Sequence, residues 1–521
     1  MENASKLFKQ RLQRIHVSVG ISASLFMYLC VFFGIFAIFL PYIQTWEKPS
    51  RHFEAANIKE INYSKMIDPV ISDPNFPTNN IIIELPGYFN DPALKVNHMF
   101  VEPVVFNPKT MQRVDDEGDN SQLARFLNHM HYGRPFMSVG YFVFGLVAVS
   151  VMLLIIGGLI QVYYLKYNNN PKNHQGKFSK YHRKVFMWLF APFVIVTLTG
   201  AYMNIGYSGS TLMTYISSKG EISNTWQAVG PVLKPQRALV EKKDEQVSML
   251  PISELIQKAE DVNPSINFDK IKLINWKDSS AQVELTGYNP NFPFLNGVFN
   301  NPVVVLSGVD GSLIEYKKVL DGNWTSMFAD TLYFLHLLFG VDIFVRTIIA
   351  IIMAICGVAI GFGVMLFLEK KAKKFDGKIP FYHWFGKLSL TVMIGVIPAT
   401  GFIFLLQWIL PFDLQDRMFW QKGLFFIAWL STLTWAFYRV CSFKAAKEFL
   451  ILGAILFMIT PLVHFYVSGF SPIELFTNNM FIILNVDIAL FIFGLLLLFI
   501  GYKIPKNRKE FKLLFSKKKD K

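Results

Sequence analysis

The chain has 521 residues, of which 52% are hydrophobic and 16% aromatic, and its formal net charge at pH 7 is +14. This composition is typical of a polytopic membrane protein and excludes a soluble enzyme. A positive charge can indicate nucleic-acid binding, but the basic residues cluster beside apolar runs, as they do in membrane topology. We therefore expect the lipid bilayer, and no nucleic acid, among its partners.

Cysteine is scarce in this sequence. Cys30, Cys356 and Cys441 lie in or at the end of apolar runs, and no two of them form a CxxC pair. This pattern excludes a disulfide framework, an iron–sulfur cluster held by four cysteines, and covalent haem attachment through CxxCH.

Eight apolar runs are near or above the roughly 20 residues that cross a hydrocarbon core. The first run is too long for a signal peptide and is interpreted as an uncleaved span. The predicted fold class is a polytopic α-helical membrane protein with about eight transmembrane helices. The runs are approximately Ile15–Ile43, Phe136–Leu165, Val185–Ile205, Thr331–Leu368, Trp384–Leu410, Phe419–Val440, Phe449–Ser468 and Met480–Tyr502.

Basic residues beside the spans predict their orientation. Clusters precede the first span, separate the second from the third, and follow the fourth, sixth and eighth spans. All of them fall on one side if both termini are cytoplasmic, so we predict a multi-pass protein of that orientation. The clusters include Lys6, Arg14, Lys172, Lys370 and Arg439.

Two polar segments then lie on the outer side, and each predicts a small α+β unit. In the second segment, PISELIQKAEDV has helical spacing and is followed by the alternating runs KIKLINW, AQVELTGY and NPVVVLSGVDGSLIEYKKV. The last run predicts a hairpin around a Val-Asp-Gly turn. A weaker copy, NIIIELPGY and then EPVVFNPKTMQRV, occurs in the first segment.

The chain thus repeats a unit of span, outer domain and span before the final spans. The predicted organisation is 1–43 as the first span, 44–133 as the first outer domain, 134–206 as spans two and three, 207–330 as the second outer domain, 331–370 as span four, and 371–521 as a four-span C-terminal bundle with a basic tail.

A histidine and a glycine recur at one separation in three spans. Because 18 residues make about five helical turns, the two residues share one helix face and lie roughly 27 Å apart. An imidazole at one end of that face and bare backbone at the other predict a surface that holds haem. The pairs at this separation are His16 and Gly34, His182 and Gly200, and His383 and Gly401.

Depth in the membrane predicts which histidines share an iron, because bis-histidine ligation needs two imidazoles from different helices at one level. The repeat pairs His16 with His182 near the cytoplasmic side. It pairs His131 with His336 near the outer side, since the second span corresponds to the fourth. We therefore predict two haem b groups, with the glycines of the first two copies forming part of the haem-binding faces.

Three other histidines are lower-ranked candidates as iron ligands. His129 lies two residues before His131, so the two point to different helix faces and only one would ligate. His383 carries the third copy of the spacing and could serve a third haem or replace one partner. His464 lies at the opposite depth from His383, so these two cannot share an iron. An interfacial histidine can also simply sit among lipid headgroups, as aromatic residues do.

Four further polar residues need an interpretation. Asp487 is an ionisable residue inside the last span, and a proton route and a quinone contact are both open for it. His52, His98 and His174 lie in polar loops and are expected to be solvated.

The outer units resemble PepSY domains, whose hairpin is similar to V-x-V-D-x-x-T-G. The flanking spans, with RIHVSVG, YHRKVF and TLTG, resemble the PepSY-associated transmembrane (PepSY_TM) family over about residues 1–370. That family includes bacterial inner-membrane reductases of ferric siderophores. The resemblance implies the same four histidines as ligands, an inner-membrane location, and a ferric siderophore or similar periplasmic chelate as electron acceptor.

We expect di-haem electron transfer across the membrane, with ferric-chelate oxidoreductase activity implied by the resemblance. Because no GxGxxG or comparable nucleotide motif occurs, a separate electron donor is expected, either quinol or a cytoplasmic reductase. Two alternatives remain: a transporter for a metal chelate or small solute, and a PepSY-type regulatory membrane protein without redox activity. The sequence assigns no catalytic residue.

Overall fold

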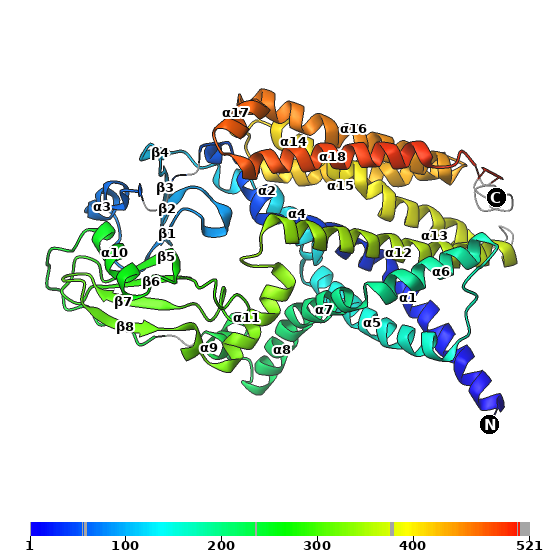
Figure 1. Ribbon diagram of the computed structural model, residues 1–521, viewed down its shortest axis with the longest axis horizontal. Coiled ribbons are helices and arrows are strands. Elements are labelled where there is room, and N and C mark those ends of the chain that lie inside the picture. Colours follow the sequence, from blue (N-terminus) through cyan, green and yellow to red (C-terminus); the bar gives the residue numbers. More distant parts are fainter. Residues whose placement is uncertain are drawn as a thin grey trace.

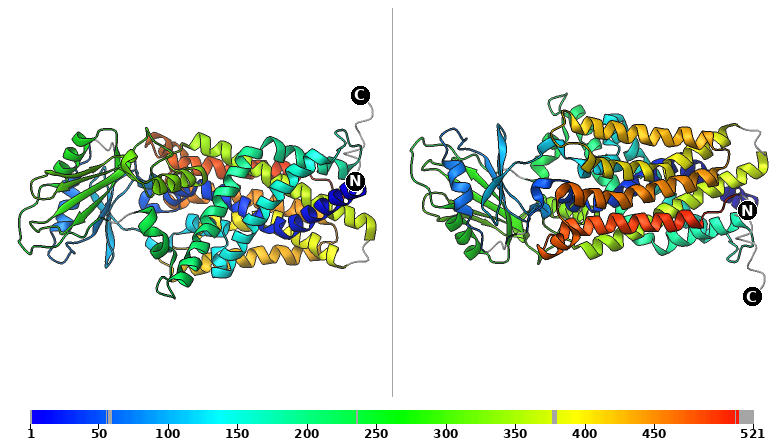
Figure 2. Two further views of the ribbon diagram at one scale, coloured as in Figure 1. Left: turned by 90° about the horizontal axis from the view of Figure 1, so that it is seen from below. Right: turned by 90° about the horizontal axis from the view of Figure 1, so that it is seen from above.

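The computed structural model describes residues 2–510 except 55, 57–59, 235–236, 376–379 and 508. A long helical bundle carries a sheet-containing unit at one end (Figure 1). The described chain begins and ends at the other end of the bundle (Figure 2). Both of its ends therefore lie away from the two polar segments, as the predicted topology requires.

Within the described residues, seven helical stretches have the length and apolar composition of membrane spans. The predicted sixth span forms the helix α15, Arg417–Tyr438, but is not among the seven, because Gln421, Lys422 and Thr432 make it more polar than its neighbours. The predicted class of multi-pass helical membrane protein is confirmed. The seven stretches are Lys6–Ile38, Arg134–Tyr164, Phe190–Ser217, Ile343–Lys371, His383–Ile409, Ser442–Ser468 and Phe481–Lys503.

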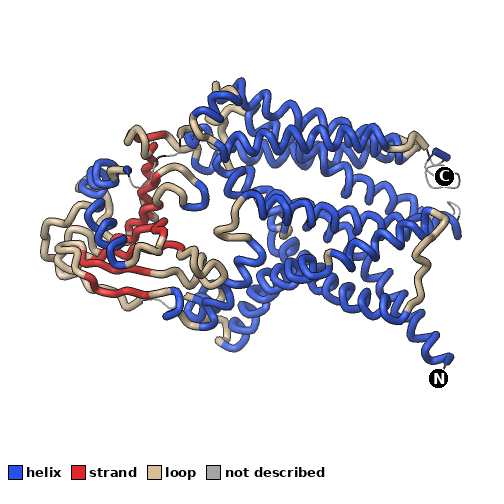
Figure 3. The backbone as a smooth tube through the Cα atoms, viewed as in Figure 1, coloured by secondary structure: helices blue, strands red, loops and turns tan. Residues whose placement is uncertain are grey.

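The helices form two groups that lie side by side (Figure 3). In the first group α1 packs against α4, α5 and α12, and α12 also packs against α6. Its helices are α1 (Glu2–Ile38), α4 (Leu123–His131), α5 (Met137–Tyr164), α6 (His174–Trp188), α7 (Phe190–Ala201), α8 (Tyr207–Ser217), α9 (Thr225–Leu233), α11 (Trp324–Leu337) and α12 (Ile343–Phe375).

The second group is the C-terminal bundle, in which α16 packs against α14 and α18. The short helix α2 (Leu40–Trp46) connects the groups, because it follows α1 in the chain and packs against α18. The helices of this bundle are α13 (Pro380–Leu390), α14 (Val396–Ile409), α15, α16 (Ser442–Ser468), α17 (Pro472–Thr477) and α18 (Phe481–Lys503).

The helix after α6 extends beyond the boundary predicted at residue 206. A π-helical turn, Tyr202–Gly206, follows α7, and α8 then continues to Ser217. This continuous helix therefore carries the bundle into the second polar segment.

The two polar segments build one antiparallel sheet instead of two separate ones. Its strand order is β4-β3-β2-β1-β5-β6-β7-β8, and β1 pairs with β5 so that Ile83 faces Ile271. The predicted hairpin is confirmed as β7 and β8, with Val304 opposite Tyr316. The strands are β1 (Ile81–Glu84), β2 (Leu94–His98), β3 (Val101–Asn107), β4 (Gln112–Val114), β5 (Asn267–Ile274), β6 (Gln282–Tyr288), β7 (Val303–Ser307) and β8 (Leu313–Lys317).

One hydrophobic core also joins the two segments. It lies between the sheet and two helices, α3 (Tyr63–Ser72) and α10 (Ile252–Val262), one from each segment. Ile67, Ile83, Leu255 and Ile271 are fully buried there. The predicted pair of α+β units thus folds around a shared interior.

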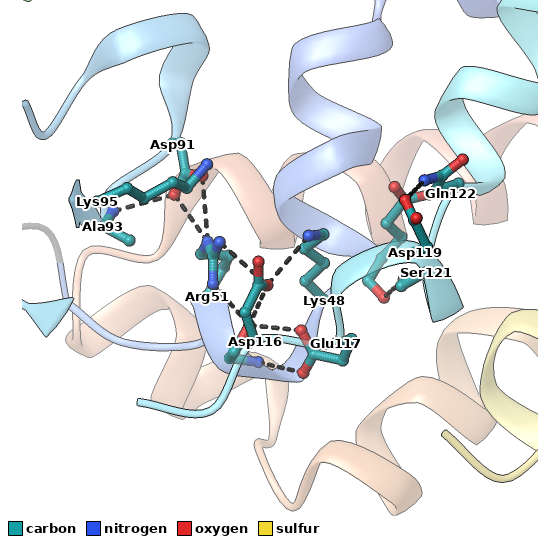
Figure 4. Close-up of polar contacts among 12 residues, drawn as sticks. Lys48, Arg51, Asp91, Ala93, Lys95, Asp116, Glu117, Asp119, Ser121 and Gln122 are labelled. Atoms are coloured by element: carbon teal, nitrogen blue, oxygen red, sulfur yellow. Dashed lines mark hydrogen bonds and ion pairs between the residues drawn. The ribbon is translucent and has the colours of Figure 1, made fainter. Parts of the chain in front are cut away.

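An ion-pair network holds the sheet unit at the end of α2 (Figure 4). Lys48 Nζ lies 3.0 Å from Asp116 Oδ1, and the Arg51 guanidinium contacts both Asp116 and Asp91 at 3.2 and 2.9 Å. Burial raises the pKa of each of these carboxyls, but Arg51 and the neighbouring lysines outweigh it and hold both pKa values below their usual range. The segment after α2 is therefore fixed by charge-assisted contacts.

The shared core predicts that damage in one segment weakens both. Ile83→Ala removes a buried side chain on the core face and should cost about 2–5 kcal/mol of stability. Limited proteolysis in increasing urea would show both segments becoming sensitive together. Ile82→Ala is the matched control, since Ile82 is only half-buried on the opposite face. Selective cleavage of residues 44–133 alone would contradict a single folding unit.

Candidate cofactor-binding sites

Two cavities lie within the first helical group. We call the larger one, of about 1190 Å3, the sheet-side pocket, and the smaller one, of about 360 Å3, the far-side pocket. Cofactor pockets commonly measure about 300–1,000 Å3. Four of the predicted residues, with Cys30, line the sheet-side pocket: Gly34, His131, Gly200 and His336. The far-side pocket is lined in part by His16, Gly158, His182 and Gly363.

The ends of two short helices position the two histidines of the sheet-side pocket. His131 is the last residue of α4, and the chain then turns through Gly133, whose φ is +77°, before α5 begins. His336 lies near the end of α11, which ends at Leu338 in the left-handed conformation before α12 begins. Each histidine therefore lies on a short helix that ends beside the long one following it.

The spacing of this pair fits a shared metal ion. The His131 and His336 ring centroids are 6.0 Å apart, with ring planes inclined by 37°. Two metal–imidazole bonds of about 2.0–2.1 Å, with about 1.1 Å from each nitrogen to its ring centre, give roughly 6.3 Å. The observed distance is close to this value.

Glycine allows each of these histidines to approach a helix backbone. A Cβ on Gly34 would lie 3.0 Å from the His131 ring, and a Cβ on Gly200 would lie 2.9 Å from His336. His131 Nδ1 is 2.7 Å from the carbonyl oxygen of Cys30, four residues before Gly34. His336 hydrogen bonds to the carbonyl four residues before Gly200, that of Val196, and its Nδ1 lies 3.0 Å from Thr199 Oγ1.

The far-side pocket repeats this arrangement for one histidine. His182 Nδ1 lies 2.8 Å from the carbonyl oxygen of Ala359, and a Cβ on Gly363, four residues later, would be 3.2 Å from the ring. A Cβ on Gly158 would lie 3.6 Å from the His16 ring, and the buried Nδ1 of His16 has no hydrogen-bond partner among the described residues. We call this device, a glycine with the carbonyl four residues before it, a histidine seat.

The histidine seat changes the role expected for the glycines. We predicted that Gly34 and Gly200 offer bare backbone to haem. Both do line the sheet-side pocket, but each also receives a histidine from another helix. Because of this constant separation, α1 and the α6–α7 segment each carry a pocket histidine at one end and the seat for another histidine at the other end.

The lower-ranked histidines lie outside both pockets. His129 packs on Tyr132, whereas His131 points into the pocket. His383 is exposed beside Phe437, and its partner glycine, Gly401, packs against Leu456 and Phe457 instead of a histidine. The third copy of the spacing thus lacks the arrangement of the first two.

Three more histidines differ from the sequence interpretation. His464 is fully buried in the C-terminal bundle, and His52 is 7% exposed instead of solvated. His174 Nε2 lies 2.9 Å from Glu369 Oε2. The sequence of the polar loop around His52 did not indicate burial, because the partner helices α14 and α16 belong to the last part of the chain, far from this loop in sequence.

The two pockets share part of one wall. Met27 of α1 and Phe193 of α7 line both of them. Basic side chains also contribute to each pocket: Arg134 to the sheet-side pocket, and Arg183 and Lys370 to the far-side pocket. Such cations can pair with carboxylates of a bound cofactor.

A comparison with known protein families shows the family of this chain. The sequence model of the PepSY-associated TM region matches residues 13–370, which include all four pocket histidines. The chain belongs to this family. No curated protein matches the chain. The matched region of the PepSY_TM family ends before α13, so the C-terminal bundle lies outside it.

The histidine seat predicts a specific steric coupling. Gly200→Ala should lower stability by about 1–3 kcal/mol, because the new Cβ collides with the His336 ring. Thermal unfolding of the purified protein measures this loss. Adding His336→Ala should restore part of it, so a double-mutant cycle isolates the contact. Gly423→Ala, with open space around the new Cβ, is the matched control. Simple additivity of the two changes would contradict the seat.

Proposed function

We propose that the chain is a di-haem electron-transfer protein of the bacterial inner membrane. His131 and His336 would hold one haem b, and His16 and His182 the other. Haem supplies one-electron redox chemistry when it is bound. The observation that carries the proposal is the His131–His336 pair, whose ring centroids lie 6.0 Å apart inside a cavity of about 1190 Å3.

The histidine seats support ligation by the opposite ring nitrogen. When Nδ1 donates to a backbone carbonyl, the ring keeps a lone pair on Nε2 and a fixed orientation, as in many metal-ligating histidines. His131 and His182 make this contact through Nδ1, and His336 hydrogen bonds to the Val196 carbonyl. These hydrogen bonds orient an imidazole in each pocket.

Two pockets in succession suit transfer across the bilayer. One cofactor cannot bridge a hydrocarbon core of about 30 Å. The shared wall of Met27 and Phe193 keeps the two pockets adjacent and separates them by apolar side chains. The electron would pass from the far-side pocket to the sheet-side pocket.

The electron acceptor would bind on the side of the membrane that carries the sheet unit. With both termini cytoplasmic, the sheet unit is periplasmic and the sheet-side pocket is the outer one. A ferric siderophore or another ferric chelate would accept one electron per iron, and reduction to the ferrous state weakens an oxygen-donor chelate. Quinol or a cytoplasmic reductase would supply the electron.

Loss of one histidine should remove one haem only. We expect His182→Ala to lower the haem content from about two to about one per chain and to leave the spectrum of the sheet-side site. Haem quantification with an optical spectrum of the purified variant measures this. His383→Ala, which alters an exposed histidine, is the control. Equal loss of all haem from His182→Ala would contradict two separate sites.

Vectorial activity can be tested in sealed vesicles. A membrane-impermeant reductant on the far side should reduce a ferric chelate enclosed on the sheet side, and His182→Ala should abolish this reaction. The readout is a colour-forming ferrous chelator inside the vesicles. Vesicles containing His383→Ala provide the control. Uptake of the intact ferric chelate without reduction would favour a transporter and contradict the proposal.

A further inference from the structure

A second histidine pair lies outside the two pockets, where the chain after α2 meets the C-terminal bundle. His464 of α16 is fully buried, and His52 follows the short 3-10 helix Pro49–Arg51. Their ring centroids are 5.1 Å apart. Trp408 of α14 packs on both rings, at 5.5 Å from His52 and 4.3 Å from His464.

A buried carboxylate completes this cluster. Asp487 of α18 is 1% exposed, and its Oδ2 lies 2.8 Å from His464 Nδ1. Trp46 of α2 donates its indole N–H to Asp487 Oδ1 at 2.8 Å. Because Nδ1 of His464 faces the carboxylate, Nδ1 carries a proton. In the neutral ring, Nε2 therefore has no proton and carries a free lone pair.

The ring of His52 also has one nitrogen without a proton. His52 Nε2 lies 3.2 Å from the carbonyl oxygen of Trp46, so it carries the proton of that ring. Among the described residues, neither His52 Nδ1 nor His464 Nε2, both buried, has a hydrogen-bond partner. The cluster thus combines two unsatisfied ring nitrogens with one buried carboxyl group, a combination that costs free energy.

We infer that His52, His464 and Asp487 form a binding site for one proton. The added proton resides on His464 Nε2 and makes this ring an imidazolium. The imidazolium neutralises Asp487 through Nδ1 and donates to His52 Nδ1 through Nε2. One positive charge therefore satisfies both unpaired nitrogens and the carboxylate.

The ring spacing is compatible with a proton bound between the two rings. An N–H···N hydrogen bond of about 2.9 Å, with about 1.1 Å from each nitrogen to its ring centre, gives roughly 5.1 Å between the rings. The His52–His464 centroid distance is 5.1 Å. The two bare nitrogens make no hydrogen bond to each other in the described structure, so the added proton would supply the missing donor.

Neighbouring charges already have partners of their own. Glu47 accepts a hydrogen bond from the Ala124 N–H at 2.7 Å, and burial raises the pKa of Glu47 to about 8. Arg417 of α15 donates to the carbonyl oxygens of Asn120 and Gln407. The cation that balances Asp487 is therefore supplied within the cluster.

The residues beside His52 are likewise occupied. Arg51 is bound by Asp91 and Asp116 (Figure 4). Burial, assisted by His464, lowers the pKa of His52 to about 3. His464 is the ring beside the carboxyl group of Asp487, so we assign His464 as the carrier and His52 as the acceptor.

This site gives the C-terminal bundle a chemical role. His464 and Asp487 both lie beyond residue 370, where the family match ends, and His52 is contributed by the matched region. Occupation of the site links the two helical groups where α2 packs against α18. The inference does not depend on haem, so it can fail or succeed independently of the proposed function.

The test is a pH titration of the full-length protein, labelled with 15N-histidine, by solid-state NMR. A buried histidine with both ring nitrogens protonated should be present at low pH and should lose one proton as the pH rises. Asp487→Asn removes the counter-charge and should eliminate this imidazolium signal. Asp342→Asn is the matched control, because Asp342 accepts backbone N–H groups at the start of α12.

Three results would overturn the inference. The first is the absence of any buried imidazolium between about pH 4 and 10, which the wild-type protein alone can reveal if the variant fails to fold. The second is a signal that persists in Asp487→Asn. The third is one copper or zinc ion per chain that disappears in His52→Ala, which would assign the site to a metal.

Discussion

The two pockets depend on one recurring contact, a histidine ring seated on a helix backbone. The ring can reach the carbonyl only where the residue four positions later has no Cβ, as at Gly34, Gly200 and Gly363. The hydrogen bond then fixes the ring and leaves the other nitrogen for a ligand. Since α1 and the α6–α7 segment each carry a pocket histidine at one end and a seat at the other, each of them contributes to both pockets.

Much of this arrangement could be predicted from the sequence because it follows local periodicity. The constant separation of histidine and glycine placed the two on one helix face, and the repeat of span, polar segment and span paired His131 with His336. The strands around Val-Asp-Gly were likewise predicted from alternation. Each of these features depends on residues that are close in sequence or related by the repeat.

Contacts between distant segments could not be predicted in the same way. Strands β1 and β5 join the two α+β units into one sheet, although the sequence of neither strand indicates which strand it pairs with. His52 was expected to be solvated, but Trp408, His464 and Phe470 pack around its ring. The spacing of His383 and Gly401 copies the motif without its function in the fold, because Leu456 and Phe457 occupy the position of the seated histidine.

The optical spectrum of the purified protein, air-oxidised and then reduced with dithionite, tests the central claim most directly when haem is quantified per chain. The account predicts about two b-type haems with sharp reduced α bands, as expected for ligation by histidine pairs in both pockets. A colourless protein, produced with ample haem supply, would contradict it.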